Sequence, residues 1–273
     1  MSTVFTPLLC ELSSRYALVM RPSERRQIIA ERLSAVGELD FVTLAQEFDV
    51  SEMTIRRDCE ILEQTGLGRR IRGRITTLSS RGYEPPRSYR ESLEMDAKAR
   101  IATAAVSLVS DGDTLILDVG TTNLEVARRL HGRRGLTVVT GSLPIAIELS
   151  GKGGVHVIVT GGSLRPGELS LTGGFAEDMM RRFNCDLAFI GVGGVAAHAG
   201  FTDYYPEAAH IKAAAMASAR KVVALADSTK VGRVVFSKFA ELSEVDLLVT
   251  NAAPDTSAVR DLRAKGLEIQ LID

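Results

Sequence analysis

The most informative stretch of the 273-residue chain is Ser51-Glu52-Met53-Thr54-Ile55-Arg56-Arg57-Asp58, which follows Thr43-Leu44-Ala45-Gln46-Glu47-Phe48-Asp49-Val50. Together these residues predict a short helix, a tight turn and a second helix that begins at Ser51, a residue type favoured as an N-cap. Hydroxyl and guanidinium groups at the start of such a helix suit the major groove of DNA, where they bond to base edges and phosphates. We therefore expect Ser51, Thr54, Arg56 and Arg57 to form part of a DNA-binding surface.

A basic segment follows, with the sequence Leu67-Gly68-Arg69-Arg70-Ile71-Arg72-Gly73-Arg74-Ile75. Its alternating arginines predict a strand with arginine side chains on one face, and Gly73 can form the bend of a hairpin. Helical patterns, the first over residues 22–37, followed by a basic hairpin indicate a winged helix-turn-helix. The arginines expected on the DNA backbone are Arg69, Arg70, Arg72 and Arg74. A solvent-exposed edge strand also explains the alternation, but not its place directly after a recognition-type helix.

Charge and cysteine content limit the class of protein. The formal net charge is only −1, yet arginines gather between Arg56 and Arg90, as expected where one small module meets phosphates. The other interpretation is that these are scattered surface arginines.

The three cysteines form no close pair, which argues against disulfides and structural zinc and fits a reducing cytoplasm. No apolar run approaches the roughly 18 residues of a membrane span. Residues 1–20 are expected to be a disordered extension, or to precede a true start at Met20.

The rest of the chain has the pattern of an α/β domain. Nearly continuous apolar runs over residues 114–119, 136–140, 155–160, 186–190, 221–226 and 246–250 alternate with helical segments, which predicts a parallel sheet covered on both faces. Gly82, Pro85 and Pro86 interrupt regular structure before these runs. We therefore expect a winged helix-turn-helix domain over residues 21–78, a linker over 79–95 and an effector-binding domain over 96–273.

Small polar residues occupy the carboxyl ends of the predicted strands, where ligands bind in such sheets. Gly120, Thr121, Thr122 and Asn123 open a helix after Asp118 and are expected to cradle a phosphate with outward-facing amides. The other strand ends carry Gly141 and Ser142, Gly162, Gly193, and Asp227 with Lys230. Lys230 and Lys212 suit an anionic ligand, although each is also a plausible surface lysine. We expect no NAD fingerprint, metal site or Ser/His/Asp triad, and we expect sugar specificity around Asp203, Tyr204 and Tyr205.

With these residues in view, the chain resembles the DeoR-type family of bacterial sugar-responsive transcriptional repressors over residues 21–273. The resemblance rests on V-S-E-M-T-I-R-R-D, D-V-G-T-T, V-V-T-G-S, T-G-G, A-F-I-G-V-G-G and A-D-S-T-K in the family's order. It implies a Rossmann-like parallel-sheet domain resembling ribose-5-phosphate isomerase that binds a phosphorylated sugar or related metabolite. It further implies that Gly120, Thr121, Thr122 and Asn123 hold the phosphate. The residues it implies for the rest of the site are Asp118, Gly141, Ser142, Gly162, Gly193, Lys212, Asp227 and Lys230.

Departures from the family pattern occur in the wing and at the strand ends. The wing ends in Arg72-Gly73-Arg74-Ile75 instead of H-G-G-A, while Gly141 and Val119 stand where Asn and Ser are usual, so the effector is expected to differ. Isomerases of this fold carry a D-G-A-D-E run where this chain has Gly193-Gly194-Val195-Ala196-Ala197. Without that carboxylate base, proton abstraction from a sugar is unsupported.

The sequence therefore predicts a cytoplasmic, non-enzymatic repressor of a carbohydrate-metabolism operon, without a cofactor and controlled by a phosphorylated sugar. Its expected partners are a double-stranded DNA operator, the small effector and further copies of itself in a homodimer or homotetramer, with no membrane. A second interpretation is a sugar-phosphate isomerase or deaminase with an appended DNA-binding module. A third is a scaffold whose helix-turn-helix binds protein, against which the basic wing argues.

Overall fold

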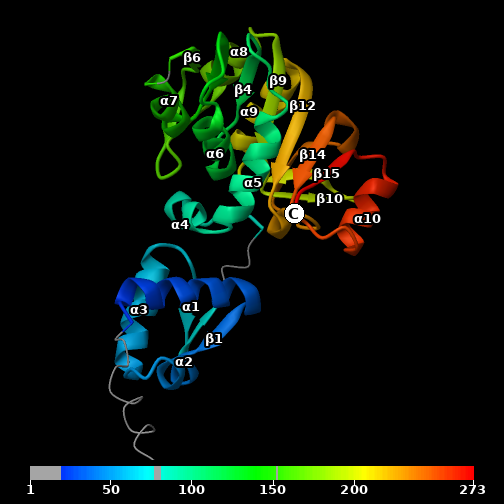
Figure 1. Cartoon of the computed structure of the whole chain (residues 1–273). Coiled ribbons are helices and arrows are strands. Elements are labelled where there is room, and N and C mark those ends of the chain that lie inside the picture. Colours follow the sequence, from blue (N-terminus) through cyan, green and yellow to red (C-terminus); the bar gives the residue numbers. More distant parts are fainter. Residues whose placement is uncertain (1–19, 77–80, 152) are drawn as a thin grey trace, which may run out of the picture. The chain divides into compact units, whose positions relative to one another are not determined.

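A computed structural model describes residues 20–76, 81–151 and 153–273 (Figure 1). The chain forms two compact units that divide between residues 79 and 80. The predicted N-terminal extension lies outside the described residues, except for Met20. No helix in the described ranges has both the length and the apolar character needed to cross a membrane.

The first unit is a winged helix-turn-helix, as predicted. Its helices are α1 (Pro22–Val36), α2 (Phe41–Glu47) and α3 (Glu52–Gln64), and its antiparallel sheet has the order β1 (Glu38–Asp40), β3 (Arg74–Thr76), β2 (Arg69–Ile71). Gly37 ends α1 in the left-handed conformation, with φ of 83°, which a glycine adopts without strain. The core is formed by fully buried Ile29, Leu33, Ile55 and Ile75. Cys59 is buried among them, and this burial raises the pKa of its thiol to about 12.

The wing is a tight hairpin whose turn consists of Arg72 and Gly73. Both residues have positive φ, 41° and 83°, as a two-residue type I′ turn requires. This turn breaks the alternation on which the sequence prediction relied. Because β2 and β3 pair Arg70 with Ile75 and Ile71 with Arg74, Arg70 lies on the face that carries the buried Ile75. The prediction that the wing arginines share one face is therefore wrong.

The second unit is built on a seven-stranded parallel sheet (Figure 1). In spatial order its strands are β15 (Ile269–Leu271), β14 (Leu247–Thr250), β12 (Ala219–Ala226), β9 (Cys185–Gly191), β4 (Thr114–Leu117), β5 (Leu136–Thr140) and β6 (Val155–Val159). Chain order runs outward from β4 in one direction and, after β6, restarts at β9 in the other. This is the doubly wound arrangement, which has a topological switch point between β4 and β9.

Helices cover both faces of the sheet. They are α5 (Met95–Val106), α6 (Thr121–Arg129), α7 (Leu143–Ser150), α8 (Gly174–Met180), α9 (Pro206–Ala217) and α10 (Ser257–Ala264). Leu115 and Leu117 of β4 pack in the core shared with α5, α6 and α7, whereas the intervening Ile116 packs in the core shared with α8, α9 and α10. Successive side chains of a strand point to opposite faces, so burial on both faces explains the continuous apolar runs in the sequence.

The second unit also contains several smaller elements. The hairpin β7 (Ser163–Arg165) and β8 (Ser170–Thr172) follows β6, and a small antiparallel sheet contains β10 (Gly194–Ala196), β11 (Gly200–Asp203) and β13 (Ser237–Ala240). Two short 3-10 helices span Ser228–Lys230 and Leu242–Glu244. Helix α4 (Arg87–Ser92) lies within residues 79–95, which the sequence predicted to be a linker. Pro86 immediately precedes α4, so the prolines that suggested a linker instead mark the start of a helix.

Candidate functional site

The first candidate surface is the exposed start of α3. Ser51 caps this helix: its Oγ accepts a hydrogen bond from the Thr54 backbone N–H at 3.2 Å and lies 2.9 Å from Thr54 Oγ1. Arg56 and Arg57 are exposed on the next turn. Arg56 is held by Glu52, with Nη2 2.7 Å from Oε1, and its guanidinium lies 5.7 Å from the centre of the Phe41 ring. The residues predicted for this surface are thus brought together on two consecutive helical turns.

The wing arginines fall into two groups. Arg69, Arg72 and Arg74 are exposed, although Arg74 also pairs with Glu38. Arg70 instead anchors the wing to α3, because its Nε donates to Glu63 Oε2 at 2.7 Å and its backbone N–H donates to Glu63 Oε1 at 2.9 Å. This pairing lowers the pKa of Glu63. Arg70 therefore holds the wing against α3, and its contact with DNA stays a prediction.

A buried ion pair fixes the orientation of α3. Asp58, the last residue of the decisive stretch, is 3% exposed and accepts a hydrogen bond from Arg25 Nε of α1 at 2.6 Å. Arg26 Nη1 donates to its other oxygen at 3.3 Å. Asp58 therefore supports the buried face of α3.

The second candidate site lies at the switch point of the parallel sheet. Asp118 follows β4, and its Oδ2 accepts a hydrogen bond from the Gly191 N–H, at the end of β9, at 3.0 Å. Lys212 of α9 is buried and donates to Asp118, to the Gly191 carbonyl at 2.8 Å, and lies 3.3 Å from Asp203 Oδ2. Burial by itself would lower the pKa of Lys212, but the carboxylates of Asp118 and Asp203 raise it above its ordinary value. Its three N–H donors therefore bond to protein acceptors. Lys212, Asp118 and Asp203 together form the floor of the site.

The predicted phosphate cradle is the N-terminus of α6. Gly120 precedes the helix with φ of 122° and ψ of 162°, and no side chain caps this end. The first N–H groups of a helix have no partner within it, so the amides of Thr121, Thr122 and Asn123 are available to an anion. Asn123 is fully buried, and neither polar atom of its side chain has a hydrogen-bond partner among the described residues.

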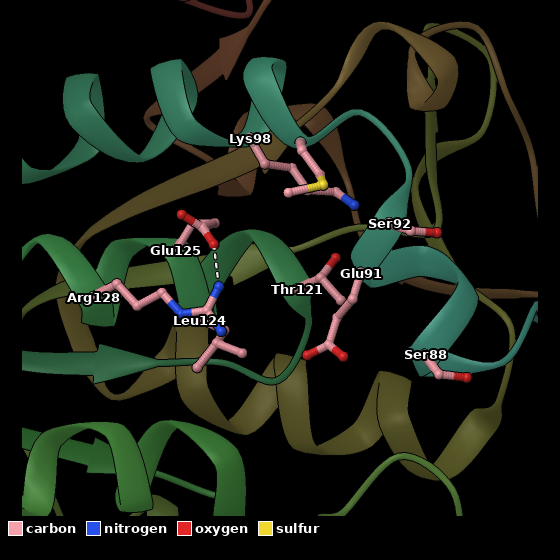
Figure 2. Close-up of a pocket in the computed structure, with 9 residues that line it drawn as sticks. Ser88, Glu91, Ser92, Lys98, Thr121, Leu124, Glu125 and Arg128 are labelled. Atoms are coloured by element: carbon pink, nitrogen blue, oxygen red, sulfur yellow. Dashed lines mark hydrogen bonds and ion pairs between the residues drawn. The ribbon is translucent and has the colours of Figure 1, made fainter. Parts of the chain in front are cut away.

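A cavity of about 330 Å³ opens beside this helix (Figure 2). It is lined by Ser88, Glu91, Ser92, Met95, Lys98, Thr121, Leu124, Glu125 and Arg128. Its volume is within the range of small-molecule sites. Lys98 is 5% exposed and donates to the carbonyls of Arg90 and Leu93, which attaches α4 to α5. Burial lowers the pKa of Lys98 to about 8, against the opposing effect of Asp227.

Asp227 and Lys230 form a second charged group at the end of β12. Asp227 is buried and accepts a hydrogen bond from the Thr229 N–H at 3.0 Å. Burial lowers the pKa of Lys230, and Asp227, Arg233 and Arg90 all interact with it electrostatically. Lys230 and Asp227 are also coupled to Lys98, so this group adjoins the cavity.

The remaining predicted residues cap a helix or pack closely against neighbouring parts of the second unit. Ser142 caps α7, and the Gly141 carbonyl accepts a hydrogen bond from the Leu171 N–H of β8 at 2.8 Å. Gly162 adopts φ of 118° and lies so close to the hairpin that an added Cβ would sit 2.5 Å from the Thr172 carbonyl oxygen. These glycines let the β7–β8 hairpin close over the strand ends. Gly193 packs under the Tyr204 ring, where an added Cβ would come 3.1 Å from Cε2.

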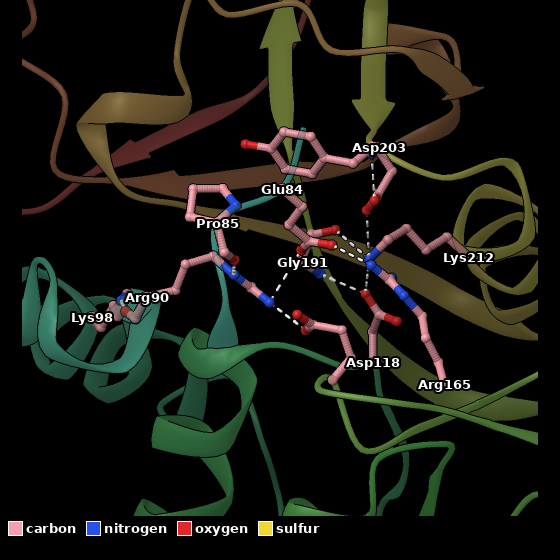
Figure 3. Close-up of polar contacts among 11 residues, drawn as sticks. Glu84, Pro85, Arg90, Lys98, Asp118, Arg165, Gly191, Asp203 and Lys212 are labelled. Carbon is pink, nitrogen blue, oxygen red and sulfur yellow. Dashed lines mark hydrogen bonds and ion pairs between the residues drawn. The ribbon is translucent and has the colours of Figure 1, made fainter. Parts of the chain in front are cut away.

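Sequence reasoning missed an ion-pair network above the floor (Figure 3). Arg90 of α4 pairs with Glu84 at 3.1 Å and with Glu168, while Arg165 Nη2 donates to Glu84 Oε2 at 2.8 Å. The Arg165 guanidinium lies 3.8 Å from the centre of the Tyr205 ring. Glu84 is electrostatically coupled to Asp203, which connects this network to Lys212.

The network also accounts for the last of the arginines between Arg56 and Arg90, which the sequence associated with phosphate contacts. Arg90 is engaged within the second unit, and Arg87 pairs with Glu91 at 3.0 Å on the same helix. Only one sequence feature could have indicated this network: charged residues and tyrosines are mixed around Pro85 and Pro86, and a flexible linker does not require them.

Comparisons with known proteins cover most of the chain. Residues 25–81 match the family model of the DeoR-like helix-turn-helix domain, and residues 93–252 match that of the DeoR C terminal sensor domain. The HTH-type transcriptional regulator GlpR of Haloferax volcanii is 34% identical over 250 residues, which span 92% of this chain and 98% of that protein. The glycerol-3-phosphate regulon repressor of Escherichia coli is 28% identical over 252 residues, with 92% and 100% covered.

Similarity to solved structures is weaker. Ribose 5-phosphate isomerase A from Methanocaldococcus jannaschii matches 50% of this chain and 54% of its own, with 19% identity and a TM-score of 0.37. A likeness at this level carries no argument about mechanism.

Proposed function

We propose that this chain, which belongs to the DeoR family of transcriptional regulators, represses a carbohydrate-metabolism operon. In this proposal its first unit binds operator DNA, and its second unit binds a phosphorylated sugar or related metabolite that controls this binding. The observation that carries the effector proposal is the uncapped N-terminus of α6, which opens after Asp118 at the switch point of a doubly wound sheet.

The DNA-binding proposal is supported by the exposed groups of the first unit. Ser51, Thr54, Arg56 and Arg57 occupy the start of α3, where a recognition helix contacts base edges and nearby phosphates. Arg69, Arg72 and Arg74 of the wing are exposed and suit the sugar-phosphate backbone. Because helix-turn-helix proteins read pairs of half-sites, we further propose a homodimer or homotetramer.

The effector proposal is supported by the charge and shape of the second unit. The amides of Thr121, Thr122 and Asn123 would hold a phosphate, with Lys98 and Lys230 as the nearby cations. The adjoining cavity of about 330 Å³ suits a small phosphorylated metabolite. The E. coli relative is named for glycerol 3-phosphate, a compound of this chemical class.

An enzymatic function is less well supported by the same site. Its best candidate acid–base pair, Asp118 and Lys212, is bonded within the protein, and Lys212 already has three acceptors. The run from Gly193 to Ala197 supplies no carboxylate. We therefore expect no measurable conversion of ribose 5-phosphate or amino-sugar phosphates.

The proposal is tested by fluorescence anisotropy with a labelled duplex from the region upstream of the protein's own gene and a scrambled duplex of equal length. We expect tighter binding to the natural duplex and a change in its affinity upon addition of at least one sugar phosphate. An effector acts only through different affinities for the two states, and each tenfold change corresponds to about 1.4 kcal/mol. Equal affinity for both duplexes, together with turnover of a sugar phosphate, would refute the proposal.

A further inference from the structure

Two buried tyrosine hydroxyls have no hydrogen-bond partner among the described residues of the second unit. They belong to Tyr83, which lies shortly before α4, and to Tyr204, which follows β11 and is 3% exposed. Buried polar groups in folded proteins are nearly always hydrogen-bonded, and each one left unpaired costs about 1–3 kcal/mol. Two such groups in one region require an explanation, and a ligand that bonds to both hydroxyls supplies one.

The contacts around Tyr204 lead to Lys212 and Asp118, beside the start of α6. The Tyr204 ring packs on Gly193, and the charges that act on its hydroxyl belong to Arg233, Glu84, Arg90 and Asp203. Asp203 in turn contacts Lys212, which lies on the floor beside Asp118. Figure 3 shows Glu84 and Arg90 near Asp203 and Lys212.

Tyr83 joins the same cluster from a different part of the chain. It directly precedes Glu84 of the ion-pair network, and burial raises the pKa of its hydroxyl to about 12. A tyrosine hydroxyl is protonated at physiological pH and can donate one hydrogen bond as well as accept one.

We propose that the Tyr83 and Tyr204 hydroxyls bind hydroxyl groups of the effector and thereby determine its specificity. The ligand is then a phosphorylated polyol or sugar, with its phosphate at the start of α6 and its hydroxyl-bearing end at the two tyrosines. This inference rests on the proposed effector function and extends it to residues outside the glycine-rich strand ends.

The chemistry of the two hydroxyls favours a polyol over an apolar group. Arg90 and Arg165 are already paired with Glu84 and Glu168, and the guanidinium of Arg233 lies 5.6 Å from the centre of the Tyr204 ring. Phenol hydroxyls both donate and accept, as sugar hydroxyls do, so the two sets complement each other.

A contact from Tyr83 also has a regulatory meaning. Tyr83 lies at the beginning of the second unit, only a few residues after the wing strand β3 ends at Thr76. An effector that bonds to Tyr83 acts directly on the segment that leads from the DNA-binding unit.

The test uses the full-length protein and the variants Tyr83→Phe and Tyr204→Phe, which remove only the hydroxyls. Ser107→Ala is the control, because it removes an exposed hydroxyl at the far end of α5, where Ser107 Oγ donates to the Ala104 carbonyl at 2.7 Å. Binding of glycerol 3-phosphate, ribose 5-phosphate, fructose 1-phosphate and inorganic phosphate is measured by calorimetry, and the melting temperature is measured without ligand.

We expect each of the two variants to lose about fivefold in affinity for the best sugar phosphate, as one net hydrogen bond predicts. Inorganic phosphate should bind within twofold of wild type, and the ligand-free melting temperature should stay equal or rise, because an unpaired buried group is removed. Ser107→Ala should change no affinity by more than twofold.

Three results would overturn the inference: unchanged sugar-phosphate affinity in both variants, an equal loss for inorganic phosphate, or a lower ligand-free melting temperature that reveals a structural bond. An equal loss in Ser107→Ala would also count against it. If the wild-type protein binds no member of the panel, the proposed effector function fails first, and the role of the tyrosines fails with it.

Discussion

Gly120, which precedes α6, adopts a backbone conformation that favours glycine and leaves room for the proposed phosphate. Its replacement by alanine tests both roles. Its φ of 122° and ψ of 162° lie in a region that is essentially restricted to glycine. An added Cβ would meet no atom within 4 Å, so the cost comes from backbone strain and not from a clash. Such strain amounts to about 1–3 kcal/mol. In a domain of this size each kcal/mol lowers the melting temperature by roughly 2–4 °C, so a fall of about 2–12 °C is expected.

The same substitution should weaken binding of the phosphorylated effector. The added methyl group, or the backbone shift that relieves the strain, prevents the close approach of the phosphate to the amides of Thr121 and Thr122. Loss of one hydrogen bond to a charged group corresponds to about 1.5–3 kcal/mol, or roughly 10- to 150-fold in affinity. Calorimetric titration with the best sugar phosphate of the wild-type protein measures this effect.

Gly266→Ala is the matched control for this experiment. Gly266 has φ of 88° and open space at the Cβ position, but it lies after α10 and outside the proposed site. It should lose about 1–2 kcal/mol of stability and no affinity for the effector. Equal affinity losses in the two variants, or none in Gly120→Ala, would refute the assignment of the cradle.

Three further perturbations address other parts of the molecule. Removal of Arg69 and Arg72 together should reduce the slope of log affinity against log salt by roughly 0.9 per lost phosphate contact, as measured by anisotropy, whereas Arg70→Ala should mainly destabilise the wing. Asp58→Ala leaves Arg25 buried without its partner and should cost the first unit about 3–5 kcal/mol in denaturant unfolding; a loss below 1 kcal/mol would contradict the role given to this pair. Lys98 has a pKa of about 8 in the folded protein, so its ammonium is lost as the pH rises through 8, and the affinity for sugar phosphate should fall there. Because the unfolded chain keeps that proton up to about pH 10.5, the Lys98 contribution to stability should rise with pH between these values, and Lys98→Met should remove both dependences.

The architecture of the second unit could be predicted because its sheet is buried on both faces. Every residue of a run such as 114–117 then faces a core, which leaves an unbroken apolar signal in the sequence. The helix start after Gly120 could also be predicted, since a small residue there follows an apolar strand pattern, and the phosphate that it would hold stays a prediction. The cap at Ser51 follows from the side-chain chemistry of a single residue and is present in the structure.

The parts that could not be predicted depend on long-range pairing or on local breaks in a pattern. Glu84 and Arg165 are 81 residues apart, and Arg90 and Glu168 are 78 apart, so no local spacing reveals their contacts. The direction of Arg70 could not be read from alternation, because the Arg72–Gly73 turn reverses the chain within the basic run. Composition alone identified residues 79–95 as a linker, whereas charged partners elsewhere in the chain anchor this segment to the second unit.

The two buried cysteines give each unit of the unmodified chain its own chemical reporter of opening. Cys59 lies in the core of the first unit and Cys185 begins β9 of the second, and burial raises the pKa of both thiols. An alkylating reagent attacks the thiolate, so each sulfur is protected until its surroundings unfold. Pulsed labelling followed by peptide mass spectrometry therefore times the opening of each unit separately, without an introduced dye. The same record would reveal whether a sugar phosphate protects only the sheet that holds it or also the helices that read DNA.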